Sequence, residues 1–166
     1  MKFKPTFVLF IPLVIWAFVI FYFSSQPYKE QDITPLISKY ANGINWSEYF
    51  GWVHFSYSNS IISIEKLGVP HFIEFFIRKA AHLFIFFVLG FLTIRILHKY
   101  SASRFISLLG SFFFIVLYAA LDELHQKFTG GRTPLAEDVL IDSIGGTLGI
   151  LAYFLFVFIR GKKKKN

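Results

Sequence analysis

Polar and ionisable side chains gather near the ends of three long apolar runs, where their types and spacing could support chemistry. Arg78 and His82 are four residues apart, as are Asp138 and Asp142, so each pair would share one helix face. The candidate polar residues are Arg78, Lys79, His82, Asp122, Glu123, Gln126, Arg132, Asp138 and Asp142. Because an ionised group at membrane depth is costly and normally pairs with another, these residues predict a network of ion pairs and hydrogen bonds.

The expected pairings in this network join the carboxylates of the last two apolar runs to Arg78, Lys79 and Arg132. His82 is expected to bridge the two middle runs. A structural interpretation is that the network fixes helix register, because polar residues hold membrane helices together at roughly 1 kcal/mol each. A functional interpretation is an outward-facing site, because so many ionisable groups exceed what register requires. The sequence leaves both interpretations open.

Metal and nucleophile chemistry have weaker support. Imidazole and carboxylate ligands for zinc, manganese or magnesium could come from His82, Asp122, Glu123, His125 and Asp138. However, the chain lacks an HExxH motif and a GxSxG motif, and it has no cysteine. We therefore expect no metal, no cofactor and no assigned catalytic residue. Paired carboxylates near a histidine keep acid–base chemistry open as an alternative.

The candidate polar residues lie within or beside long apolar blocks of the sequence. Hydrophobic residues make up 55% of the chain and charged residues 16%, against about 25% charged residues in soluble domains. Blocks of this length cannot be hidden in so small a soluble core, so lipid is the expected solvent. The sequence predicts one all-α, integral-membrane four-helix bundle over residues 1–166. Its helices are expected near 7–23, 76–97, 105–126 and 138–159.

The distribution of basic residues predicts that both chain ends are cytoplasmic. The inner segments then hold Lys2, Lys4, Lys99, Arg104, Arg160 and the lysines at 162–165. The last run reads as a lipid-headgroup anchor rather than a nucleic-acid site. The first block is expected to remain as an uncleaved helix, because Ser24-Ser25-Gln26-Pro27 lacks a small-x-small cleavage site.

The outer segment, 24–75, is long and aromatic. Its middle contains Trp46, Tyr49, Phe50, Trp52, Phe55 and Tyr57. Aromatic side chains are common at headgroup depth, so we expect a partly helical, amphipathic segment on the outer leaflet. An aromatic platform for a sugar or a lipid is the alternative.

Three glycines follow Asp142 in the fourth apolar run: Gly145, Gly146 and Gly149. Gly145 and Gly149 form a GxxxG motif, which lets two helix backbones approach closely. We expect these glycines to pack the fourth helix against another helix of the same chain, and a homodimer interface is the alternative.

At these residues the chain resembles the VanZ family of bacterial membrane proteins. The resemblance rests on Ser24-Ser25-Gln26, Arg78-Lys79-Ala80-Ala81-His82, the run from Asp122 to Phe128, Gly131-Arg132, Asp138 and the three glycines. It implies association with low-level resistance to teicoplanin-type glycopeptides at the outer surface of the bacterial cytoplasmic membrane. It implies no known reaction.

These observations favour a multi-pass envelope protein that is not an enzyme. Its outer polar network would engage a lipid headgroup or a lipid-linked cell-wall intermediate, with Arg78, Lys79 and Arg132 holding phosphate or carboxylate. The expected partners are membrane lipids, together with a peptidoglycan precursor or the glycopeptide itself. The alternative is a membrane enzyme that acts on a lipid-linked phosphate or sugar. An ion-coupled carrier is disfavoured, because the helix interiors offer no titratable relay.

Overall fold

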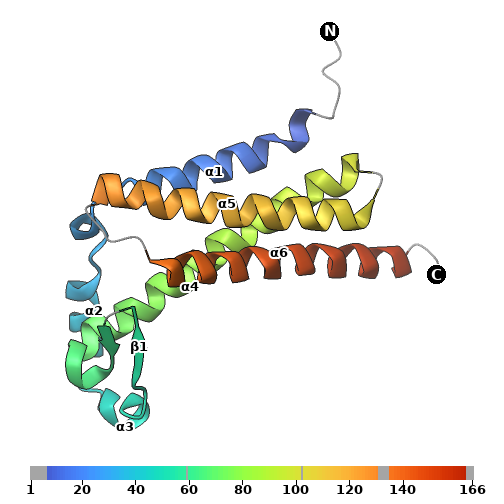
Figure 1. Ribbon diagram of the computed structural model, residues 1–166. Coiled ribbons are helices and arrows are strands. Elements are labelled where there is room, and N and C mark those ends of the chain that lie inside the picture. Colours follow the sequence, from blue (N-terminus) through green and yellow to red (C-terminus); the bar gives the residue numbers. More distant parts are fainter. Residues whose placement is uncertain (1–6, 59, 102, 131–134, 164–166) are drawn as a thin grey trace.

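The computed structural model describes residues 7–58, 60–101, 103–130 and 135–163, and these are mainly helical (Figure 1). The long elements are α1 (Ile11–Ser24), α4 (Ile64–Tyr100), α5 (Arg104–Gly130) and α6 (Ala136–Lys163). The short ones are η1 (Phe7–Leu9), η2 (Tyr28–Gln31), α2 (Thr34–Ala41), α3 (Trp46–Phe50), β1 (Phe55–Tyr57) and β2 (Ser60–Ile62).

Four helical stretches in the described part of the chain are long and apolar enough to cross a membrane. They are Phe7–Ser24, Ile64–Tyr100, Arg104–Thr129 and Ala136–Lys162. The start of α1, the end of α4, the start of α5 and the end of α6 lie at one end of the bundle (Figure 1). We call the opposite end, where α1 and α5 finish and α6 begins, the distal end. The short elements between α1 and α4 lie at this end, beside the first part of α4 (Figure 1).

Helix α4 begins at Ile64 rather than near residue 76, which corrects the expected boundary. The side chain of Ser63 caps its first turn by accepting a hydrogen bond from the Lys66 amide at 3.2 Å. Gly68 kinks the helix with a φ of 72°, a conformation that glycine adopts readily. Pro70 then falls in the first turn after the kink, where its missing N–H does little harm.

The segment before α4 contains an antiparallel hairpin, β1–β2, that the sequence analysis did not predict. Phe55 pairs with Ile62 and Tyr57 with Ser60. A strand of three residues is too short for alternation to stand out in an aromatic segment. Burial holds the hairpin in place, because Ile62 joins Ile64 and Phe72 in an apolar cluster at the start of α4.

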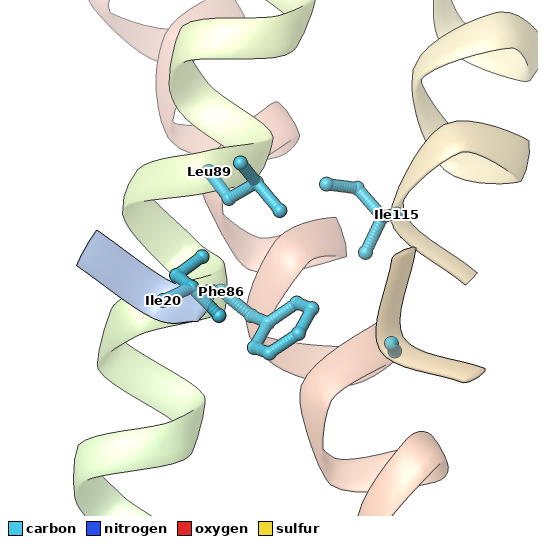
Figure 2. Close-up of a cluster of buried hydrophobic side chains, with 5 residues drawn as sticks. Ile20, Phe86, Leu89 and Ile115 are labelled. Atoms are coloured by element: carbon cyan, nitrogen blue, oxygen red, sulfur yellow. The ribbon is translucent and has the colours of Figure 1, made fainter. Parts of the chain in front are cut away.

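The centre of the bundle is an apolar cluster formed by α1, α4 and α5 (Figure 2). Its buried members are Ile20, Phe86, Leu89, Ile115 and Ala119. Ile20 is the only buried residue of α1. Hydrogen bonds to backbone carbonyls also tie α1 to the bundle: Trp16 Nε1 donates to Ile85 O at 2.8 Å, and Tyr118 Oη donates to Ala17 O at 2.7 Å. Most of the surface of α1 is left for lipid.

Glycines bring α4 and α6 into backbone contact. A Cβ atom on Gly145 would collide with the backbone of Leu83, and one on Gly149 with the backbones of Phe87 and Phe91. Gly90 of α4 faces the backbone of Gly146 in the same way. The three glycines of α6 therefore lie against α4 of the same chain. Gly146 also contacts the Ile115 side chain of α5.

Candidate functional site

A cavity of about 850 Å³ opens at the distal end, among α1, the hairpin, α4, α5 and the start of α6. We call it the distal cavity. Its charged lining residues are Glu74, Arg78, Lys79, Asp122, Glu123 and Asp138. His71, His82 and Gln126 also line it. Its apolar wall is formed by Ile20, Phe23, Ile85 and Phe86 from α1 and α4.

Asp138, on the first turn of α6, joins three elements. Its Oδ1 atom forms an ion pair with Lys79 of α4 and accepts a hydrogen bond from the Tyr57 hydroxyl of the hairpin. The Lys79 ammonium also lies 4.7 Å from the centre of the Tyr57 ring, within the range of a cation–π interaction. The sequence pairs Lys79 with carboxylates of this helix, but it treats Tyr57 as an interfacial aromatic residue.

Tyr57 lies outside the membrane-spanning helices, and burial, reinforced by the hydrogen bond to Asp138, raises the pKa of its phenol. The unfolded chain would lose this proton near its ordinary value of 10.0. A raised pKa in the folded protein therefore stabilises the fold fully below about pH 10, and this contribution is lost as the pH rises further. At neutral pH the contact between the hairpin and α6 is intact.

Arg78 pairs with Glu74 on its own helix, so its expected pairing with a carboxylate of the last two apolar runs is wrong. Its Nε and Nη2 atoms donate to Glu74 Oε1 at 3.0 and 2.8 Å, and Nη2 also donates to the Gln31 carbonyl at 3.1 Å. Glu74 is only 2% exposed. Glu74 falls in the predicted outer segment, 24–75, so its four-residue spacing from Arg78 plays no part in the pairings that the sequence predicts.

His82 pairs with Asp142 of α6 rather than bridging to α5 as expected. Its Nδ1 atom lies 3.3 Å from Asp142 Oδ1. Asp142 is 2% exposed and is not among the residues that line the cavity. The glycine contact accounts for this partner, because Gly145 packs against the backbone of Leu83, the residue next to His82, and so holds α6 close to the His82 side chain.

The end of α5 contributes Asp122, Glu123 and Gln126, all of which are nearly buried. Gln126 Nε2 donates to Asp122 Oδ2 at 3.0 Å, and the Leu135 amide donates to Glu123 Oε1 at 2.8 Å. Among the described residues, neither carboxylate has a cation within ion-pair distance. Arg132, the remaining predicted cation, lies outside the described residues.

His125 contacts α1 and is not part of the cavity lining. Its Nε2 atom lies 2.9 Å from Ser25 Oγ, and its ring stacks on Phe21 with centroids 4.5 Å apart. Within the described ranges, no three histidine or acidic side chains come together in a way that could hold a metal ion. Among the described residues, the cavity is therefore lined by ion pairs and by two carboxylates with no cation at ion-pair distance.

A comparison with known proteins assigns the chain to a family. The family model described as VanZ/LLP1 matches residues 8–157, which include every residue found to line the cavity. No curated protein and no solved structure matches the chain. With a family match over most of its length and four helices apolar enough to span a bilayer, the chain is a membrane protein that belongs to the VanZ/LLP1 family.

Proposed function

We propose that this protein resides in the bacterial cytoplasmic membrane and binds a lipid headgroup, or the headgroup of a lipid-linked cell-wall intermediate, in the distal cavity. By occupying that ligand, it would lower the sensitivity of the cell to teicoplanin-type glycopeptides. The observation that carries the proposal is the combination of charged lining residues and an apolar wall in one cavity.

The two parts of the lining fit the two parts of a lipid. Charged residues of α4, α5 and α6 can hold a polar headgroup, while Ile20, Phe23, Ile85 and Phe86 offer an apolar surface to the start of an acyl or prenyl chain. The cavity volume of about 850 Å³ is within the range of small-molecule sites. Helix α1, with one buried residue, is a wall that a lipid can approach from the side.

Orientation is part of the proposal, because the ligand must reach the cavity from outside the cell. The basic residues of the predicted inner segments favour cytoplasmic chain ends, and therefore a distal end that faces outward. The chain has no cysteine, so single cysteines can be introduced without interference. In intact cells, Glu48→Cys on α3 should react with a membrane-impermeant maleimide, whereas Lys99→Cys should react only after permeabilisation. Both native side chains are exposed. The reverse pattern would overturn the proposed orientation.

Two neighbouring alanines of α4 give a matched test of binding. Ala81 lines the cavity and Ala80 lies outside the lining, while both are exposed enough to accept a larger side chain. Ala81→Trp should block the cavity and reduce co-purifying lipid by about tenfold, whereas Ala80→Trp should leave it unchanged. Native mass spectrometry of protein purified from bacterial membranes measures the bound lipid.

The same pair of variants tests the cellular role. Cells that produce the wild-type protein or Ala80→Trp should tolerate more teicoplanin than cells that produce equal amounts of Ala81→Trp. Full lipid occupancy in Ala81→Trp would show that lipid binds elsewhere. Equal tolerance in all strains, including one without the protein, would remove the link to glycopeptides.

A further inference from the structure

The distal cavity has an excess of negative charge deep in its lining. Four carboxylates and two basic side chains line it. Arg78 is neutralised by Glu74 and Lys79 by Asp138, so these cations already have anionic partners. Asp122 and Glu123 remain, exposed by only 6% and 5% respectively. Within the described lining, the unmatched charge is therefore negative, which does not favour a phosphate held by Arg78 and Lys79.

Hydrogen bonds satisfy these two carboxylates only in part. Asp122 accepts one from Gln126 and Glu123 one from the Leu135 amide, although a carboxylate has about four lone-pair sites. A third lining group, the Ser24 hydroxyl of α1, is buried beside Asp122, and a hydroxyl that donates to this carboxylate keeps lone pairs that can accept a hydrogen bond. An ionised carboxylate at membrane depth needs a cationic partner, because desolvation without one is expensive.

A ligand ammonium fits this arrangement better than a metal ion. The carboxylates and histidines of the described chain do not cluster as metal ligands would. An ammonium group has three N–H donors, and Asp122 and Glu123 of α5 and Ser24 of α1, which line the same cavity, offer oxygen acceptors to such donors. The phosphate of such a headgroup would remain at the open side of the cavity, nearer to solvent.

We propose that the headgroup bound in the distal cavity carries a primary ammonium group, held by Asp122 with Glu123 as the second acceptor. This inference rests on the proposed function and names the chemical class of its ligand: an amine-bearing lipid. The apolar chain of that lipid would lie along Ile20 and Phe86.

The test compares lipids that share a phosphate and matched acyl chains but differ in whether the headgroup carries an ammonium group. Full-length protein, stripped of lipid in detergent, is titrated with phosphatidylethanolamine, phosphatidylglycerol and N-acetyl-phosphatidylethanolamine with matched acyl chains. Native mass spectrometry should show at least about tenfold tighter binding of phosphatidylethanolamine than of the other two, because a charge-assisted hydrogen bond is lost in each. The soluble headgroup glycerophosphoethanolamine is added as a competitor, and EDTA is present to exclude divalent ions.

Variants of the protein give a second readout. Asp122→Asn and Glu123→Gln keep side-chain size but remove the charge, so each should reduce the preference for phosphatidylethanolamine about tenfold. Glu65→Gln, which changes an exposed carboxylate of α4, should leave the preference unchanged. Because the lipid series uses the wild-type protein, the test stands even if a variant does not fold.

The outcomes separate the two proposals. Equal binding of all three lipids overturns the ammonium inference but leaves lipid binding in place. Binding of no lipid overturns both proposals. A preference for phosphatidylethanolamine that survives in Asp122→Asn and Glu123→Gln overturns the assignment of these carboxylates. Competition by glycerophosphoethanolamine supports the ammonium site and shows that the headgroup suffices without the acyl chains.

Discussion

Replacing Gly149 with leucine should destroy most of the folded protein. A Cβ atom at this position would overlap backbone atoms of Phe87 and Phe91 in α4, and backbone cannot move aside as a side chain does. The two helices must separate, which also opens the neighbouring contacts at Gly145 and Gly90. Overpacking of a tight core costs about 1–3 kcal/mol for small additions, and an entire leucine side chain should reach or exceed that range.

Gly161 provides the matched control, because it lies on the same helix and a Cβ atom there would meet nothing within 4 Å. Gly161→Leu should behave like the wild type, or gain slightly from helix propensity. Size-exclusion chromatography of detergent-solubilised protein after heating measures the fraction that stays monodisperse. Gly149→Ala should fall between Gly149→Leu and the wild type. A Gly149→Leu protein as heat-resistant as Gly161→Leu would show that the α4–α6 contact is not tight.

Replacing Asp138 with alanine should detach the hairpin from the bundle and destabilise the protein by about 2–3 kcal/mol. The Lys79 ammonium would lose its ion-pair partner and Tyr57 its hydrogen-bond acceptor in one step. Breaking a fully buried pair costs about 3–5 kcal/mol. We expect less here, because the Lys79 and Asp138 side chains keep 21% and 17% of their exposure, so water screens part of the interaction.

Hydrogen exchange should locate this effect in the hairpin. In Asp138→Ala, amides of β1 and β2 should exchange faster at neutral pH, while those in the middle of α5 should not change. Tyr57→Phe removes only the hydrogen bond and should show a smaller effect of the same kind. Lys79→Ala combined with Asp138→Ala should be less damaging than Asp138→Ala alone, because no unpaired ammonium remains. Unchanged hairpin exchange in Asp138→Ala would contradict the role of Asp138 as the junction.

Apolar block length predicted the long helices well, because twenty or so consecutive apolar residues have few alternatives to a membrane helix. The block around Leu89 was identified, but its N-terminal extension to Ile64 was not. Gly68 and Pro70 look like helix-breaking residues in sequence, and only tertiary packing of Ile62 and Phe72 against the early turns reveals that the helix continues through a kink.

The candidate residues were easier to identify than their partners. Residue type and spacing predicted that Lys79, Asp122 and Asp138 would gather at one end of the bundle, and all three line the distal cavity. Pairing depends on which helices face one another, which the sequence does not give. The predicted partners of Arg78 and His82 therefore differ from those in the structure. Glu74 was missed because a carboxylate before the apolar block reads as a solvent-exposed group, although it is buried in the structure.

The glycine contact between α4 and α6 has a consequence for the entropy of assembly. In lipid, helices form before they associate, so the backbone freedom of glycine is already lost when Gly90 meets Gly146. A leucine or methionine interface must also immobilise rotatable side chains, whereas these glycines have none to freeze. The contact therefore gains the dispersion energy of close backbones without this entropic opposition. This small entropy loss favours association of α4 and α6 within lipid, where no hydrophobic effect drives the two helices together.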